Sequence, residues 1–162
     1  FCQSIRTFFS TSFAWPPMLQ FEIDTKAIDD QLAALVTKAQ RAARLGAKAG
    51  AEVYYDAVKA QAPVSEKAHW FHGSSFKSTG QKYWFESGSL KGAVYQYFQR
   101  ESSPANPTYH VAWNHRKVPY GFMVTAGTKR GVRGNDFVGD ARKTVQARAI
   151  AAMTSEFQQA MK

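Results

Sequence analysis

Large apolar residues recur at helical spacing in the first long segment of the chain. They stand three or four positions apart, as on one face of an α-helix, and are Ile28, Leu32, Leu35, Val36 and Ala39. The pattern continues to Ala62-Pro63, where proline disfavours helix in the residue before it. The sequence predicts a helix over about residues 25–61, about 55 Å long if unbroken, with Gly46 and Gly50 as candidate bends.

Both the length of this helix and its small residues allow two interpretations. Its length exceeds the diameter of a domain of 162 residues, so it either kinks or acts as a spine for assembly. Small residues also recur four apart along it, which gives either ordinary core or close contact with a helix of another subunit. These residues are Ala39, Ala43, Ala47 and Ala51.

Patterns typical of strands follow the helix. Aromatic and β-branched residues alternate with others in residues 90–98, 109–113 and 120–125, which predicts three strands in an antiparallel meander. Residues 64–89 lack a steady period and form a long loop in this interpretation, with room for a short hairpin. A second helical pattern runs from about 138 to 161. The expected fold is α+β: a long N-terminal helix, an antiparallel sheet of three to four strands, and a C-terminal helix.

The first seventeen residues differ from the rest of the chain. They hold no acidic residue and a single Arg6, and polar residues interrupt their apolar ones, unlike a signal peptide. We interpret residues 1–17 as a leader or upstream extension outside the fold, with Met18 as the natural start. Residues 18–162 then form one domain with the long loop at 64–89.

Charge and cysteine content narrow the classes of partner and site. Lysine and arginine total 21 against 12 acidic residues, and the net charge of +9 favours anionic or acidic partners. The single Cys2 excludes an internal disulfide and a multi-cysteine metal centre. No apolar run approaches the 18 residues or so of a membrane-spanning helix, so we expect no membrane contact.

The patterns that bear on catalysis are weak. His69 and His72, with Glu66 or Glu86, have a spacing conceivable for zinc but lack a partnering motif. The group of His110, Asn114 and His115 lacks the context of a nuclease, and the chain has no G-x-S-x-G elbow. GTKRGVRG lacks the spacing of a phosphate-binding loop. We therefore predict no catalytic residue, no metal, no cofactor and no enzymatic activity.

Basic and aromatic side chains suggest contacts with DNA or with other proteins. Lys129, Arg130 and Arg133 cluster in one loop, where they would meet phosphates or an acidic neighbour, or stay solvated. Aromatic residues of the 64–89 loop could stack bases, yet they lack the regular placement of a single-strand platform. A basic DNA-binding accessory protein is thus the alternative function.

Ordered landmarks in the chain resemble one known family. The alanine-rich helix ends in Ala62-Pro63-Val64, and Gly88-Ser89-Leu90-Lys91 precedes the first predicted strand. Tyr120 and Ala126-Gly127-Thr128 follow, and Asp136-Phe137-Val138-Gly139-Asp140-Ala141 leads into the last helix. In this order, from about Met18 to Lys162, they resemble the neck or tail-completion proteins of tailed bacteriophages, small minor tail proteins that join the filled head to the tail.

This sequence departs from the pattern of the family at three places. Thr125 stands where the family usually has glutamate, Asp136 and Asp140 replace prolines, and the loop from Ser65 to Ser87 is enlarged. These departures concern the detailed contacts at interfaces.

The resemblance implies a structural virion protein that acts in the neck or tail and assembles in the host cytoplasm. We expect a homo-oligomeric ring, sixfold like the tail, stacked between the head connector or adaptor and the tail tube or tail terminator, and surrounding the DNA path. Interface-type side chains supply its candidate ring or docking contacts. They are Trp70, Phe71, Tyr83, Trp84, Phe85, Tyr120 and Phe137. Lys129, Arg130 and Arg133 would face channel DNA or an acidic partner.

Overall fold

A computed structural model describes residues 24–73, 76–129, 131 and 133–162, and residues 1–17, Met18 and Arg130 lie outside this part of the chain. The fold is α+β, as expected from the sequence. Its elements in chain order are α1 (Lys26–Gln61), β1 (His69–His72), α2 (Phe76–Thr79), β2 (Lys82–Phe85), α3 (Ser89–Gly92), β3 (Val94–Phe98), β4 (Tyr109–Trp113), α4 (Gly121–Ala126) and α5 (Phe137–Met161).

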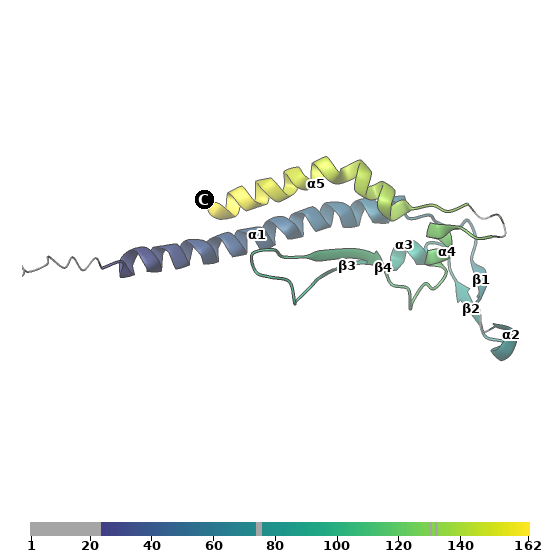
Figure 1. Cartoon of the computed structure of the whole chain (residues 1–162). Helices are drawn as coiled ribbons and strands as arrows, with labels where there is room; N and C mark the ends of the chain where they lie inside the picture. The colour runs from purple at the N-terminus through teal and green to yellow at the C-terminus, as the bar shows by residue number, and fades with distance from the viewer. Residues whose placement is uncertain (1–23, 74–75, 130, 132) are drawn as a thin grey trace, which may run out of the picture.

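The two long helices run antiparallel and form the body of an elongated molecule (Figure 1). The predicted helix is confirmed, and of the two alternatives it is the unbroken one: Gly46 and Gly50 are contact points with α5 and do not interrupt it. A Cβ at Gly46 would lie 2.8 Å from the carbonyl oxygen of Met153, and one at Gly50 would lie 2.5 Å from the Met153 Cγ. The absence of side chains here lets α1 and α5 approach closely.

Most of the core lies where the last half of α1 meets the start of α5 and the small elements between them. Phe137 is 1% exposed, and Val58, Leu90 and Val118 are each 2% exposed. Asp136 caps α5, since its Oδ1 accepts a hydrogen bond of 3.0 Å from the Gly139 amide. This cap places the first residue of α5, Phe137, in the centre of the core.

The sheet is smaller and more divided than the sequence predicts. Strands β1 and β2 form one antiparallel pair, and β3 and β4 form another, with Val94 opposite Trp113 and Phe98 opposite Tyr109. The hairpin for which the 64–89 loop had room is therefore present, and it consists of β1 and β2. The predicted strand at 109–113 is confirmed, whereas that at 90–98 begins with helix α3 and becomes a strand at Val94.

The predicted third strand, at 120–125, is wrong because this segment forms the short helix α4. The Asn114 side chain accepts hydrogen bonds from the amides of Arg116 and Lys117 and turns the chain after β4. Gly121 then lies against Trp113, and a Cβ there would overlap the indole nitrogen. The amide of Val124 bonds to the carbonyl of Tyr120, which closes a helical turn in place of a strand pairing.

α1 extends past the C-terminal end of α5, as Figure 1 shows, and the β1–β2 hairpin lies at the opposite end of the molecule. Every residue from 24 to 38 is exposed, and Ala39 is the first partly buried one. We call residues 26–38 the overhang.

Candidate functional site

The β1–β2 hairpin holds most of the aromatic residues that the sequence analysis selected. Its inner face carries His69, Phe71 and Phe85, which surround the ring of Tyr120 at centroid distances of 5.3, 5.9 and 4.8 Å. Burial raises the pKa of the Tyr120 hydroxyl above its usual value, and a backbone hydrogen bond with Leu90 partly opposes the shift. This face attaches the hairpin to the body of the protein.

The outer face of the hairpin carries Trp70, Trp84 and Lys82, and we call it the tryptophan face. Trp70 and Trp84 stand opposite each other in the strand register, with ring centroids 5.0 Å apart. Trp70 is 53% exposed and Trp84 50% exposed. The Lys82 ammonium lies 5.2 Å from the centroid of the Trp70 ring. Cross-strand pairing holds two large aromatic side chains in place on the surface.

The alternation of a β-strand explains why one short hairpin has two such different faces. Successive side chains point to opposite sides, so His69 and Phe71 face the body while Trp70 and His72 face outward. His72 stacks on Phe76 of α2 with centroids 4.3 Å apart. The sequence HWFH therefore combines a packing surface with an exposed one.

The seven candidate interface residues divide between surface and core. Trp70, Tyr83 and Trp84 are exposed, and Phe71 and Tyr120 are partly buried. Phe85 is 8% exposed and Phe137 is 1% exposed, so both pack in the core and we withdraw them from the docking surface. Phe137 also lies apart from the hairpin group, with its ring 5.8 Å from that of Trp113.

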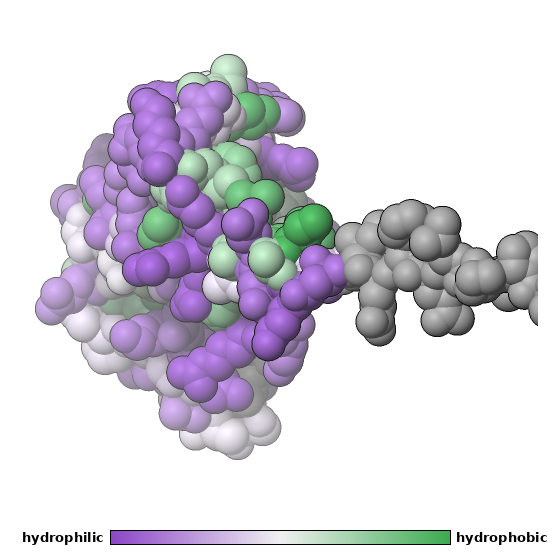
Figure 2. Space-filling view, turned by 90° about the vertical axis from the view of Figure 1, so that its left-hand side faces the viewer, coloured by the Kyte–Doolittle hydropathy of each residue, from purple (hydrophilic) through white to green (hydrophobic). Residues whose placement is uncertain are grey.

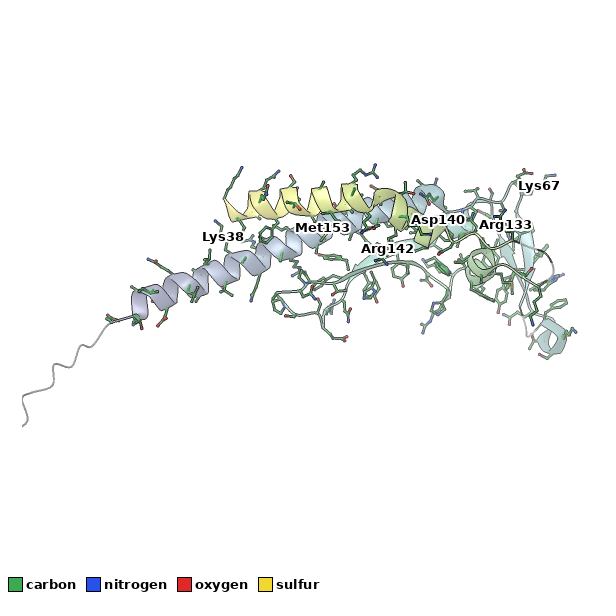
Figure 3. The ribbon with its side chains drawn as sticks, turned by 45° about the horizontal axis from the view of Figure 1, so that its top comes forward. Lys38, Lys67, Arg133, Asp140, Arg142 and Met153 are labelled. Carbon is green, nitrogen blue, oxygen red and sulfur yellow. The ribbon has the colours of Figure 1, made fainter. Side chains whose placement is uncertain are left out.

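The two described members of the basic cluster are both exposed. Lys129 and Arg133 form no ion pair with another described residue. The segment after Arg133 packs against the end of α4. The Asn135 amide donates a hydrogen bond of 2.8 Å to the Val124 carbonyl, and a Cβ at Gly134 would lie 2.8 Å from the Thr125 carbonyl oxygen. Figure 3 places Arg133 and Lys67 at the hairpin end of the molecule.

Three histidines contact aromatic rings or a polar group, and His115 is exposed. His69 and His72 belong to the hairpin contacts described above, and His110 lies 2.9 Å from the Gln99 Oε1 and stacks on Tyr97. Within the described ranges no group of three His, Cys, Asp or Glu side chains could hold a metal ion. None of the helices in those ranges is long and apolar enough to cross a membrane.

A groove beside α1 was not predicted from the sequence. Two cavities, of about 760 and 340 Å³, share Ala47, Pro107 and Met153 and lie between α1, α5 and the segment 105–111. We call them together the seam groove, and Figure 3 labels two of its lining residues, Met153 and Arg142. The sequence signal was indirect: Met153 and Phe157 belong to the apolar pattern of α5 but are each 38% exposed.

Comparisons with family models, with curated proteins and with solved structures gave no significant match. The resemblance to phage neck and tail-completion proteins therefore stays a prediction that rests on the landmarks in the sequence.

Proposed function

We propose that the protein is a structural component of a tailed phage or prophage virion. It forms a ring at the head–tail junction, joins the head connector or adaptor to the tail tube or terminator, and surrounds the DNA path. The observation that carries the proposal is the tryptophan face, where two half-exposed tryptophans stand at one end of an elongated body. Tryptophan in a fixed position is typical of residues that dominate binding energy at protein interfaces.

The proposal gives the protein a non-enzymatic role, in which geometry carries the function. This role is supported by the contacts of side chains that could act in catalysis. His69 packs against Tyr120, and His110 interacts with Gln99 and Tyr97. One interface repeated by rotation closes a ring, so a small α+β subunit with an exposed aromatic face suits such an assembly.

The second candidate is a basic DNA-binding accessory protein. Two observations favour it: the net charge of +9, and the exposure of Lys129 and Arg133 without an ion pair to a described residue. Phosphate contacts make affinity fall steeply as salt rises. Within the ring proposal, the same side chains would meet channel DNA or an acidic neighbour.

Electron microscopy of the purified protein tests the first candidate directly. The full chain is imaged alone and after mixing with tail tubes or with connector-bearing heads, and rings or capped tails are expected. Trp70→Ala with Trp84→Ala should abolish capping while leaving the far-ultraviolet circular dichroism unchanged. Ile150→Ala is the matched control, because Ile150 is 54% exposed and lies on α5, away from the hairpin.

Two results would count against parts of this proposal. Capping that survives the double tryptophan substitution would remove the tryptophan face as the docking surface and leave the ring itself standing. A protein that stays monomeric with every partner yet binds duplex DNA with a steep salt dependence would exclude the ring and favour the DNA-binding alternative.

A further inference from the structure

The overhang presents large apolar side chains that no described element covers. Ile28 is 63% exposed, Leu32 57%, Leu35 53% and Val36 47%. Figure 2, viewed from this end of the molecule, shows green hydrophobic atoms interrupting the purple surface. Helices gain most of their stability from packing an apolar face, so four exposed large residues on one helix indicate a missing partner.

The exposed residues continue the face that packs on α5. Ile28, Leu32 and Leu35 stand at intervals of four and three, and the same spacing leads through Ala39 and Ala42 to Gly46. Gly46 touches α5. Figure 3 shows that α5 ends near the level of Lys38, so the overhang lies beyond the end of α5. The apolar stripe is therefore exposed because α5 ends too early to cover it.

The seam groove lies along the same helix, directly after the overhang. Its α1 lining runs from Ala43 to Val58, about 22 Å at the helical rise, and the overhang from Lys26 to Lys38 measures about 18 Å. Its other walls include Met153, Phe157 and Pro107. An apolar helix face and a groove of similar length, lined by both apolar and polar residues, thus follow each other on one chain.

The charges at the tip of α1 and in the groove indicate how an overhang would be oriented in the groove. The tip of α1 carries Asp29 and Asp30 and follows Asp24, so three carboxylates outnumber the one ammonium there, that of Lys26, in a chain with a net charge of +9. Arg142 lines the groove on the side of Met153 nearer the hairpin (Figure 3) and forms no ion pair within the described ranges. Asp136 lines the same cavity, and its Oδ1 accepts a hydrogen bond from the Gly139 amide. A tip placed beside Arg142 would run antiparallel to the α1 that it meets.

We propose that the occupant of the seam groove is the overhang of a second copy of this chain, exchanged reciprocally about a two-fold axis. Two antiparallel α1 helices centred near Arg41 place each overhang beside the groove of the other subunit, so one isologous contact covers both stripes. The inference does not rest on the proposed function, because it concerns the free protein.

Sedimentation equilibrium of the full chain tests the exchange. The wild type is expected to be a dimer at about 100 µM, well above a micromolar dissociation constant. Leu32→Asp with Leu35→Asp in the overhang should weaken the dimer about 100-fold or more. Ala105→Arg with Thr154→Arg, two exposed positions in the groove, should weaken it similarly. Ile150→Asp, at an exposed α5 position outside the groove, is the control and should dimerise normally.

Mixing the two double variants distinguishes the exchange from other pairings. The overhang variant keeps an intact groove and the groove variant keeps an intact overhang, so their mixture retains one of the two contacts. It should form a heterodimer more readily than either variant forms a homodimer. A monomeric wild type at the same concentration would overturn the proposal. So would a groove variant that dimerises as the wild type does, since that result indicates direct pairing of the two apolar stripes.

Discussion

Gly46 and Gly50 lie one helical turn apart on the face of α1 that meets α5, yet an added methyl group would meet different atoms at the two positions. At Gly46 the nearest atom is the Met153 carbonyl oxygen, 2.8 Å from where the methyl carbon would lie, and a backbone atom moves only if the helix moves. At Gly50 the nearest atoms are the Met153 Cγ and Sδ, at 2.5 and 2.7 Å. The Met153 side chain is flexible, and the residue is 38% exposed.

Two opposing effects set the size of the change. Alanine in place of glycine within a helix contributes about 0.5–1 kcal/mol to stability. Overpacking an interface costs about 1–3 kcal/mol when the neighbour cannot move. We expect Gly46→Ala to lower the free energy of unfolding by about 1–2 kcal/mol. Gly50→Ala should leave it unchanged or raise it by up to about 1 kcal/mol, because Met153 can adopt another rotamer.

Urea denaturation followed by circular dichroism measures both variants. Gly92→Ala serves as the control, because a Cβ there meets no atom within 4 Å and Gly92 ends a short helix. Equal destabilisation by Gly46→Ala and Gly50→Ala would refute the reasoning, since it would mean that the identity of the opposing atom does not matter. A more stable Gly46→Ala variant would show that α1 and α5 are less tightly packed than the distances indicate.

Three further predictions concern the core and its cap. Phe137→Ala should lower the free energy of unfolding by about 3–5 kcal/mol in urea denaturation, because its ring is 1% exposed, and a loss below about 1 kcal/mol would contradict its central position. Because the pKa of Tyr120 is raised in the folded state, its contribution to stability is complete below the pKa of an unfolded tyrosine and is lost as pH rises through the folded pKa. The wild type should therefore lose stability more steeply above about pH 10 than Tyr120→Phe, and parallel pH profiles would exclude this cause. Asp136→Ala should lower stability by about 1 kcal/mol through loss of the cap on the Gly139 amide, and Asp136→Asn should restore most of it in thermal denaturation.

The sequence predicted the two long helices, α1 and α5, well because their signals are long and local, whereas the short helices α2, α3 and α4 were not predicted. Proline after Ala62 ends α1 where expected, and the pattern of α5 begins within one residue of Phe137. The sequence left open whether the glycines of α1 bend the helix, because what they permit, a close approach to Met153, depends on a helix about a hundred residues away in the chain. Spacing along one segment does not show which partner lies opposite.

The errors in the sheet and the site have the same origin. Alternation in residues 120–125 fits a strand, but the contact between Gly121 and Trp113 and the turn at Asn114 favour a helix. Aromatic residues were selected for the site by type, and only the two faces of the hairpin separate Trp84 from its buried neighbour Phe85. The apolar stripe of the overhang was visible in the sequence, but its exposure was not, because that depends on where α5 ends.

The antiparallel pairing of α1 with α5 has a practical consequence for labelling. It brings Lys162 to the half of the molecule opposite the hairpin, where α1 continues past it towards Asp24, the first described residue (Figure 1). A fluorophore or affinity tag attached at Lys162 would therefore leave the tryptophan face open to a binding partner. The same attachment would sit close to the overhang, so measurements of self-association require an untagged C-terminus.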